Sequence, residues 1–354
     1  IVNEMIEMVD IYEGMSICDP ACGVGKFLLE AIEDKIPEYF NYKTEKLEKN
    51  IDIIGFDKMM SDRDDLTIIL AKANMLIYFS ELFKRNNSLQ DVKTISQSLL
   101  NKSYYLYQTM LGTLGDLEEN KYDLILANPP YYQSKVMMEA AKATGYYVLN
   151  GAGVESLFLE WILKSLKPGG TANVVLPDGI FSNYANSKLK EYILKNFFVE
   201  SIISLPVGAF FNTPKKTYIL TVRKATEREK EDNKTQDYPV FTYIATSIGE
   251  SLDVYRFDIE DNDLKEAVAI SEQIKEKIGA EGVSYEEKIA KVSVVGIGLK
   301  THYETTSEIF DTLAENNINI DMISCSEINV SCIIREEDID KAVNALHKRF
   351  IEID

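Results

Sequence analysis

Two short segments of the sequence, and two acids that lie between them, can bind a ligand or position a reacting group. The first is Asp19-Pro20-Ala21-Cys22-Gly23-Val24-Gly25, which lies between an apolar run and a helical pattern. Gly23 and Gly25 can adopt positive φ and let backbone amides approach a ligand at a helix N-terminus. A tight turn from strand to helix is the plain alternative, and the two glycines alone leave both interpretations open.

Two acids further along the chain favour a nucleoside as the ligand. Asp57 ends the next apolar run, where its carboxylate can accept hydrogen bonds from both ribose hydroxyls. Asp116 is expected near the end of a third short strand, where it can meet an adenine amine. The third glycine of the dinucleotide-binding pattern is missing, and Asp57 follows Gly25 by about 32 residues rather than about 20. Because Asp19 would repel a pyrophosphate and attract an ammonium group, S-adenosylmethionine fits better than a dinucleotide.

The second segment, Asn128-Pro129-Pro130-Tyr131, follows the apolar run Tyr122–Ala127. The two prolines stiffen the backbone, so the Asn128 amide and the Pro129 carbonyl would be held at the end of a strand. An amine that donates hydrogen bonds to both acceptors loses its planar conjugation, and its lone pair can then face a methyl sulfonium. The ring of Tyr131 can stack on the flat group that carries the amine. A rigid turn without chemistry is the alternative, and the glycine loop upstream disfavours it.

Together with three later segments, these motifs resemble the DNA adenine N-6 methyltransferase family. The later segments are Gly151–Gly170 (GAGVESLFLEWILKSLKPGG), Val175–Asn183 (VLPDGIFSN) and Ile203–Leu220 (ISLPVGAFFNTPKKTYIL). The HsdM-type modification subunits of type I restriction-modification systems are the closest kin that the motifs suggest, over roughly residues 1–260. The resemblance implies a Rossmann-like sheet of seven strands, S-adenosylmethionine as the methyl donor, and a target adenine flipped out of the duplex.

The resemblance also implies roles for individual residues. It implies donor binding for Asp19, Pro20, Ala21, Cys22, Gly23, Gly25, Asp57 and Asp116, and catalysis for Asn128, Pro129, Pro130 and Tyr131. Tyr131 and Phe211 would sandwich the flipped base, with Phe210 as the alternative to Phe211. The implied partners are DNA, an HsdS-type specificity subunit and, as a further candidate, a restriction subunit. No metal site is expected.

The C-terminal part of the chain resembles a different family. Residues Ile289–Phe350 include VGIG, NINIDMIS, SEINVS and ALHKRF, and they resemble the C-terminal ACT domain of aspartate kinase. In that family paired ACT domains bind lysine or threonine between them. The positions that match effector-side residues are Thr306, Asn319, Ile320, Ser326 and Glu327. An ACT-mediated dimer is a further expectation, and a folded appendage without a ligand is the alternative.

Composition limits the classes of function. Lys and Arg total 38 against 57 for Asp and Glu, and the net charge of −19 argues against strong unaided binding to duplex DNA or anionic lipid. The four cysteines form two distant pairs without CxxC spacing, which disfavours a disulfide framework or a zinc site and favours a reducing cytoplasm. The two histidines nearly exclude His-based triads. No apolar run approaches about 18 residues, so no membrane span is expected.

Alternating apolar runs and amphipathic stretches are expected to position these motifs. The expected strands are Met15–Cys18, Ile51–Phe56, Tyr122–Ala127, Thr171–Leu176, Ser201–Leu205 and Thr217–Val222, and the expected helices are Lys26–Glu33, Leu66–Phe83, Glu155–Leu166 and Ser187–Asn196. Lys167–Gly170 is expected to end a helix and form a turn. This alternation is typical of an α/β fold with a mostly parallel sheet.

The chain is therefore expected to contain two domains. Residues 1–265 would form a Rossmann-like, S-adenosylmethionine-dependent methyltransferase domain, 266–284 a linker, and 285–354 a small ferredoxin-like α+β ACT module. The leading hypothesis is a site-specific, adenine-specific DNA methyltransferase. The alternative is a regulatory protein that binds lysine or threonine through its ACT module and carries an inactive methylase remnant.

Overall fold

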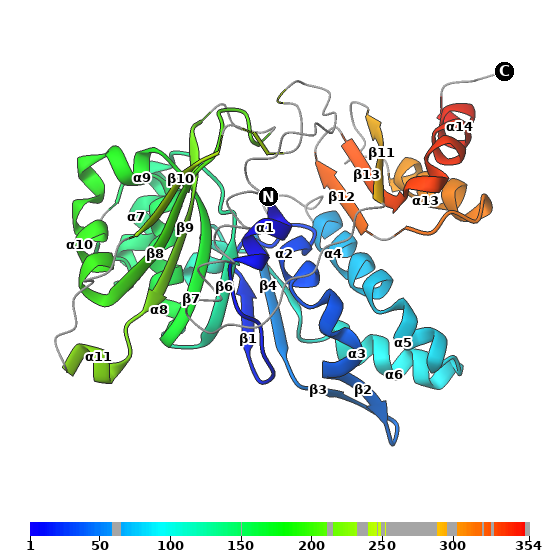
Figure 1. Ribbon diagram of the computed structural model, residues 1–354, viewed down its shortest axis with the longest axis horizontal. Helices are drawn as coiled ribbons and strands as arrows, with labels where there is room; N and C mark the ends of the chain where they lie inside the picture. Colours follow the sequence, from blue (N-terminus) through cyan, green and yellow to red (C-terminus); the bar gives the residue numbers. More distant parts are fainter. Residues whose placement is uncertain are drawn as a thin grey trace. The chain divides into compact units, whose positions relative to one another are not determined.

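The computed structural model divides into two compact units (Figure 1). Unit 1 comprises Ile1–Cys22, Asn50–Lys58 and Tyr107–Val283, and unit 2 comprises Gly23–Lys49, Met59–Leu106 and Ser284–Asp354. The structure describes residues 1–58, 65–149, 151–210, 215–231, 240–245, 247–248, 252, 289–295, 303–320, 322–326 and 329–350. The expected linker 266–284 lies outside these residues, so the boundary between the two domains stays a prediction.

A mixed sheet of eight strands runs through unit 1, in the order β10-β8-β9-β7-β6-β1-β4-β5. Its strands are β1 (Ser16–Asp19), β4 (Asp52–Lys58), β5 (Tyr104–Tyr107), β6 (Tyr122–Ala127), β7 (Leu166–Pro177), β8 (Phe197–Ser204), β9 (Thr217–Lys224) and β10 (Phe241–Ile244). The end strand β5 reaches unit 1 only at Tyr107. Strand β9 is antiparallel to β7 and β8, whereas the pairs β1–β4, β1–β6, β6–β7 and β8–β10 are parallel. The predicted α/β fold is confirmed, although the sheet has eight strands rather than the seven that the resemblance implied.

The central strands are apolar on both faces of this sheet. In β6, Ile125 and Ala127 belong to the core beneath the helices, whereas Leu124 and Leu126 alternate onto the opposite face, and all four are fully buried. On that opposite face, the Asn173 side chain of β7 donates to the Met5 carbonyl of α1 (Val2–Glu7). Strands that are covered on both faces have nearly continuous apolar sequences, which accounts for the pattern of β6.

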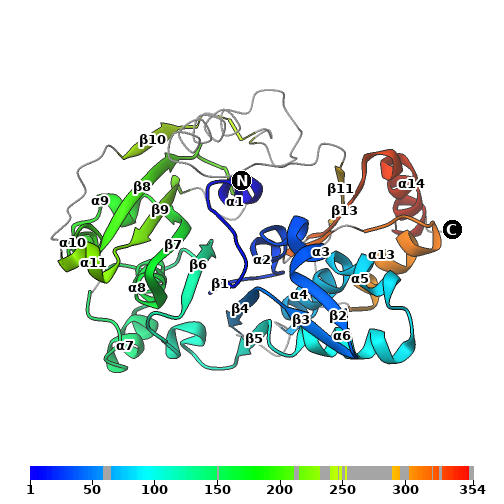
Figure 2. The ribbon, with the colours of Figure 1, turned by 60° about the horizontal axis from the view of Figure 1, so that its bottom comes forward.

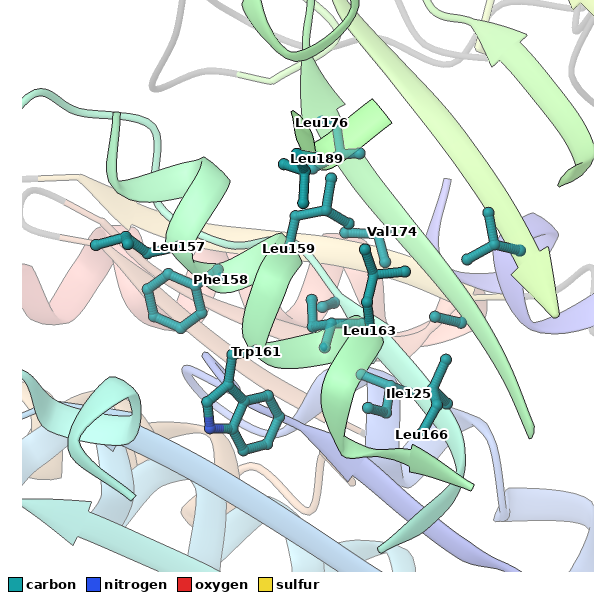
Figure 3. Packing of buried hydrophobic residues seen from close by; sticks show 14 of the residues in the cluster. Ile125, Leu157, Phe158, Leu159, Trp161, Leu163, Leu166, Val174, Leu176 and Leu189 are labelled. Atoms are coloured by element: carbon teal, nitrogen blue, oxygen red, sulfur yellow. The ribbon is translucent and has the colours of Figure 1, made fainter. Parts of the chain in front are cut away.

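Helix α8 (Val154–Ser165) lies at the centre of the main core of unit 1 (Figure 3). Lys164 is its only residue that is not buried. The helix packs between α7 (Lys135–Ala143) and α10 (Ser187–Asn196), and Trp161, Leu159 and Leu163 face the strands beneath it. Each fully buried side chain of this size contributes about 2 kcal/mol to stability. The helix is thus surrounded by other elements on nearly all sides, and its buried residues include the two acids Glu155 and Glu160.

Two local predictions differ from the structure. Lys167–Gly170 was expected to form a turn but belongs to β7, where a Cβ on Gly170 would lie 3.0 Å from the Asp123 carbonyl of β6. Tyr122 of β6 pairs with Leu166 and Leu124 pairs with Thr171, so the stretch Lys167–Gly170 of β7 forms a bulge between these two pairs. The expected helix Leu66–Phe83 is two helices, α4 (Asp65–Tyr78) and α5 (Ser80–Arg85).

The first two segments of unit 2 form a set of short helices and a hairpin. The elements are α2 (Lys26–Glu30), η1 (Glu33–Lys35), α3 (Ile36–Tyr39), β2 (Phe40–Lys43), β3 (Lys46–Lys49), α4, α5 and α6 (Leu89–Leu100). The β2–β3 hairpin lies beside α6, where Lys49 donates to the Ser98 carbonyl (Figure 2). None of the helices in the described part of the chain is long and apolar enough to cross a membrane.

The last segment of unit 2 is a three-stranded antiparallel sheet with two helices. The elements are β11 (Ile289–Val295), α13 (Tyr303–Glu315), β12 (Met322–Ser326), β13 (Asn329–Arg335) and α14 (Ile339–Phe350), with the sheet order β11-β13-β12. Their small core includes Ile309, Leu313, Ile334 and Leu346. This order of elements confirms the predicted α+β module.

Within unit 2, helix α4 contacts the edge strand β12. The buried Asn74 side chain donates to the Ile323 carbonyl and accepts from the Ile323 N–H, at 2.5 Å each. Leu66 and Leu70 of α4 pack against the Ile323 side chain. Asn74 therefore hydrogen-bonds to both backbone groups of Ile323 as a neighbouring strand would, which protects that part of the sheet edge.

Candidate functional site

The predicted donor and acceptor motifs of unit 1 meet at one edge of its sheet. Strands β6, β1 and β4 are parallel neighbours, with Cys18 paired to Ile125 and Asp19 paired to Gly55. Because the carboxyl ends of parallel strands lie at the same edge, Asp19, Asp57 and Asn128 all emerge there. Ligands of open α/β sheets bind outside this edge.

Asp19 is a buried acid at the end of β1. Its side chain is 1% exposed, and its Oδ1 accepts a hydrogen bond of 3.0 Å from the Ala21 N–H. Burial raises the pKa of this carboxyl to about 8, and the nearby charge of Asp57 also raises it, while the Ala21 bond lowers it. Without a cation beside it, the Asp19 carboxyl group is therefore mostly protonated near pH 7. A cation bound next to it would favour the ionised form.

The loop after Asp19 is held against β4. The Cys22 N–H donates to the Phe56 carbonyl at 2.9 Å, directly before Asp57. Burial raises the pKa of the Cys22 thiol well above its ordinary value, so this thiol stays protonated and is a poor nucleophile. The Lys58 N–H donates to Asp57 Oδ1 at 2.7 Å. Asp57 is partly exposed and thus accessible to a ligand.

The two glycines of the loop belong to unit 2, and both have left-handed backbones. Gly23 has φ of +53° and Gly25 has φ of +80°, a region that L side chains rarely adopt. A Cβ on Gly25 would lie 2.4 Å from the Tyr104 hydroxyl, whereas a Cβ on Gly23 would meet no atom within 4 Å. Gly25 is thus required both by its φ and by a neighbour, and Gly23 by its φ.

Asp116 follows a 3-10 turn rather than a strand. The turn η2 (Gly112–Gly115) precedes it, so the expectation of a strand end at Asp116 was wrong. The turn is held in place by two hydrogen bonds: the Thr113 hydroxyl donates to the Pro20 carbonyl at 2.8 Å, and the Leu114 carbonyl accepts from the Tyr147 hydroxyl at 2.7 Å. The segment that carries Asp116 is therefore bonded to the loop that follows Asp19.

Two aromatic residues place the Asp116 side chain. The Tyr107 hydroxyl donates to Asp116 Oδ2 at 2.7 Å, and the Trp161 indole N–H donates to the Asp116 carbonyl at 3.0 Å. The Tyr107 ring stacks on Phe56 with a centroid distance of 5.7 Å, and Phe56 also contacts Trp161 edge to face. This aromatic group connects Asp116 with the residue before Asp57, so the two acids are held by one cluster.

The Asn128–Tyr131 segment follows β6. The Tyr131 hydroxyl donates to Asn128 Oδ1 and, at 3.2 Å, to the Val175 carbonyl of β7. Burial, followed by the charge of Glu155, raises the pKa of the Tyr131 hydroxyl, so it stays a hydrogen-bond donor. The amide oxygen that was predicted to accept from a substrate amine is thus occupied by Tyr131 in the structure.

The start of α8 and the residue Lys215 border this segment. The Val154 N–H donates to the Tyr132 carbonyl at 3.0 Å, and Lys215 Nζ donates to the Tyr131 carbonyl at 3.3 Å. Glu155, in the first turn of α8, is 4% exposed. Burial raises the pKa of its carboxyl, whereas its own backbone N–H and the charge of Lys215 lower it.

The predicted base-stacking and effector residues are only partly described. Phe210 is partly buried in unit 1, but Phe211 lies outside the described residues. In unit 2, Thr306 is buried in α13, and Asn319 and Ile320 precede β12. Ser326 ends β12, and Glu327 lies outside the described residues. Their roles in effector binding stay predictions.

Four residues of the site were missed from the sequence: Tyr107, Trp161, Glu155 and Lys215. Trp161 could have been singled out from the sequence, since it is the only tryptophan of the chain. Glu155 had a weaker sequence signal: acids are rarely buried unless they are paired, and Glu155 lies in the mostly apolar stretch Val154–Leu163. Tyr107 and Lys215 carried no signal, since their roles depend on contacts with distant segments.

No metal-binding cluster occurs at this site. Among the described residues, no group of three or more His, Cys, Asp or Glu side chains could hold a metal ion. The described part of the site thus offers carboxylates, an amide and aromatic rings as its chemical groups. These groups suit the binding of a nucleoside and the positioning of an amine.

The mixed α/β sheet and the motifs at its carboxyl edge define a methyltransferase-like fold, and comparison with known proteins gives the family. Residues 1–302 match the family model for N-6 DNA Methylase, and residues 292–350 match the model for the ACT domain. Because the first match covers most of the chain, the protein belongs to the N-6 DNA Methylase family.

Individual proteins resemble each part of the chain. The type I restriction enzyme EcoKI M protein is 16% identical and covers 79% of this chain and 72% of its own, with a TM-score of 0.47. A type I restriction-modification methyltransferase subunit from Streptococcus thermophilus is 16% identical and covers 77% and 51%, with a TM-score of 0.46. An aspartate kinase of Stutzerimonas stutzeri is 42% identical over 96 residues. Those residues are 27% of this chain, which spans only 23% of the kinase.

Proposed function

We propose that the protein transfers a methyl group from S-adenosylmethionine to the exocyclic amine of adenine in DNA, as the modification subunit of a type I restriction-modification system. One observation carries this proposal. Asp19, Asp57 and Asn128 converge at the carboxyl edge of β1, β4 and β6 in a chain of the N-6 DNA Methylase family. The edge thus brings acids suited to an adenosine next to an amide suited to an amine.

The residues at this edge fit S-adenosylmethionine, which would supply a methyl group on a positively charged sulfur. Asp57 would accept hydrogen bonds from the ribose hydroxyls, and Asp116 from the adenine amine. Asp19 would pair with the ammonium group, and its pKa of about 8 means that donor binding near pH 7 displaces a proton.

Asn128 and Pro129 would hold the target amine. Tyr131 donates to Asn128 Oδ1, so an entering amine would replace the tyrosine hydroxyl as the hydrogen-bond donor. The hydroxyl would keep its second acceptor, the Val175 carbonyl, and the Tyr131 ring would then be available to stack on the base. Fixing the amine in this way supplies the orientation that direct transfer requires.

The charge of the chain supports a need for partner proteins. Specific duplex binders neutralise several phosphates with Lys and Arg, whereas this chain has a net charge of −19. An HsdS-type specificity subunit would supply the recognition of DNA, and a restriction subunit would join the same assembly.

Isothermal titration calorimetry of the full chain with S-adenosylmethionine tests the first part of the proposal. We expect binding with a 1:1 stoichiometry, accompanied by proton release near pH 7. The release is measured by repeating the titration in buffers with different ionisation enthalpies. Absence of binding would contradict the proposal and favour the inactive methylase remnant.

A second candidate function is amino-acid binding by the ACT module. The 42% identity to an aspartate kinase over 96 residues favours it. The contacting residues would include Thr306, Asn319 and Ile320. Calorimetric titrations of the full chain with lysine and with threonine test this role. A titration with S-adenosylmethionine serves as the positive control. Heat from either amino acid would support it, and its absence would leave a folded module without an effector.

A further inference from the structure

Glu155 is a buried acid that the proposed reaction has not used. It lies in the first turn of α8, and its side chain is only 4% exposed. The carboxyl group folds back over Gly153, where a Cβ would lie 2.5 Å from the carboxyl carbon and from both oxygens. Gly153 also has φ of +86°. Glycine at this position therefore makes room for the Glu155 carboxyl group.

One oxygen of this carboxyl group has no partner. The Glu155 backbone N–H bonds to the carboxyl group, but the buried Oε2 atom has no hydrogen bond in the structure described. Buried polar atoms are nearly always paired, because leaving one unpaired destabilises the protein. Other buried side-chain atoms of the described residues also have no hydrogen bond, so what points to a partner from outside the chain is the position of Oε2 near the Asn128–Tyr131 segment.

Burial in α8 does not by itself leave an acid unpaired. Glu160 lies in the same helix and is 1% exposed. Its Oε1 accepts from the Val148 N–H at 2.9 Å and pairs with Lys164 at 2.8 Å, and its Oε2 accepts from the Leu149 N–H at 3.3 Å. Both carboxyl oxygens of Glu160 thus have partners within the protein, whereas Oε2 of Glu155 has none in the described structure.

Glu155 also lies beside the segment predicted to hold the target base. The preceding residue, Val154, is hydrogen-bonded to Tyr132, and the Glu155 charge acts on the Tyr131 hydroxyl. Lys215 bonds to the Tyr131 carbonyl and attracts the Glu155 carboxylate. Lys215 and Tyr131 are the titratable groups found to interact with Glu155 in the described part of the chain. A partner for Oε2 would therefore enter next to Tyr131.

The chemistry of adenine indicates what that partner is. In the proposed function, which this step depends on, Asn128 and Pro129 accept both hydrogens of the amine. The ring nitrogens of adenine are then acceptors without donors. Burial raises the pKa of Glu155 and so favours the protonated acid, which has an O–H to donate. A neutral buried acid can serve as such a donor.

We infer that Glu155 is a substrate-binding residue whose protonated Oε2 donates a hydrogen bond to a ring nitrogen of the flipped adenine. Asn128 would then hold the amine and Glu155 the ring edge, so two elements, β6 and α8, fix the base in its plane. Raising the pH through the pKa of Glu155 removes the donated proton. Base binding by the parent chain should therefore weaken as the pH rises.

Three variants of the full chain test this inference. Glu155→Gln keeps the shape and an N–H donor but does not titrate. Glu155→Leu removes the donor. Glu160→Gln is the matched control, because it changes a buried glutamate of the same helix whose oxygens are both used within the protein. Circular dichroism melting first establishes that each variant is folded.

Methylation is then measured at pH 6.5 and 8.5, as kcat and KM for DNA and for the methyl donor, with a type I specificity subunit present. At pH 6.5 we expect Glu155→Leu to lower kcat/KM for DNA by roughly 10- to 100-fold with an unchanged KM for the donor. Glu155→Gln should stay within about 3-fold of the parent and lose part of the decline with rising pH. Glu160→Gln should keep the parent's pH profile and KM for DNA.

Two outcomes would overturn the inference alone. One is a Glu155→Leu variant with the parent's kcat/KM for DNA. The other is a Glu155→Gln variant as impaired as the leucine variant, or with the parent's decline as the pH rises, since either result shows that no proton is donated from this position. If Glu155→Leu does not fold, the pH profile of Glu155→Gln decides. A parent chain that methylates no DNA contradicts the proposed function itself, and the inference falls with it.

Discussion

The donor side and the acceptor side of the proposed site are held in different ways. On the donor side each acid has a hydrogen-bond partner in the protein: Asp19 bonds to Ala21, Asp57 to Lys58 and Asp116 to Tyr107. On the acceptor side, Asn128 Oδ1 is occupied by the Tyr131 hydroxyl, and Glu155 Oε2 has no partner in the described structure. The donor side is preorganised, whereas the acceptor side changes its hydrogen bonds when a substrate enters.

This difference suits a protein that binds a constant donor and a base that must leave a duplex. A preorganised donor side binds with little loss of conformational freedom. On the acceptor side, the Tyr131 hydroxyl keeps Asn128 Oδ1 paired in the absence of DNA, because an acceptor left without a donor is destabilising. Substitutions on one side should therefore leave the other side's function intact.

The largest effect is expected from Asn128→Ala. It removes the amide that orients the target amine, so methylation should fall by at least roughly 100-fold, as when a positioned hydrogen-bonding group is removed from an active site. S-adenosylmethionine binding should be unchanged, because no donor-side residue is altered. Transfer of tritiated methyl groups measures the first quantity and calorimetry the second. Weaker donor binding with normal transfer would break the division into two sides.

Asp57→Ala should have the next largest effect, on the donor side. Losing hydrogen bonds to a charged acceptor typically removes about 1.5–3 kcal/mol. The dissociation constant for S-adenosylmethionine should thus rise by roughly 10- to 100-fold. The KM for DNA at saturating donor should be close to that of the parent. A variant that binds the donor as tightly as the parent would show that Asp57 does not hold the ribose.

Asp19→Asn should change the pH dependence of stability. The folded-state pKa of about 8 is raised from the ordinary 3.8, so the stability that this group gives is full below pH 3.8 and is lost as pH rises through 8. Its slope is at most about 1.4 kcal/mol per pH unit. An asparagine can still accept from Ala21 and does not titrate. Urea unfolding should show the variant gaining stability relative to the parent between pH 5.5 and 8, and parallel profiles would contradict this assignment.

Tyr131→Phe should have the smallest effect. It keeps the ring for stacking but removes the hydroxyl that occupies Asn128 Oδ1, so methylation should change by less than about 3-fold in either direction. Tyr131→Ala is the comparison, because it removes the ring as well. A Phe variant as impaired as the Ala variant would show that the hydroxyl acts in the reaction, and the exchange at Asn128 would then be the wrong account.

Much of the fold followed from local sequence patterns. The strand Tyr122–Ala127 and the helix Ser187–Asn196 have the predicted bounds, because a buried run and an amphipathic period are local signals. The edge strands Tyr104–Tyr107 and Phe241–Ile244 were not predicted, since short strands at a sheet edge are defined mainly by their pairing. The Lys167–Gly170 stretch was wrongly expected to be a turn because pairing with β6 overrides its Pro-Gly composition.

The candidate site divides in the same way. Asp57 and Asn128 could be placed because they follow strands directly, and parallel strands end at one edge. The turn before Asp116 could not be predicted, since bonds from Thr113 to Pro20 and from Trp161 to Asp116 hold it in place. Likewise, the contact of Asn74 with Ile323 joins residues that are far apart in the sequence. Such contacts leave no local pattern.

The most direct test of the central claim is to identify the methylated nucleoside. DNA is incubated with deuterium-methyl-labelled S-adenosylmethionine, the full chain and a type I specificity subunit, and is then digested to nucleosides for mass spectrometry. We predict labelled N6-methyldeoxyadenosine with the parent chain, and its near absence with Asn128→Ala. Label on cytosine or on protein, or equal labelling of adenine by the parent and Asn128→Ala, would contradict the proposed function.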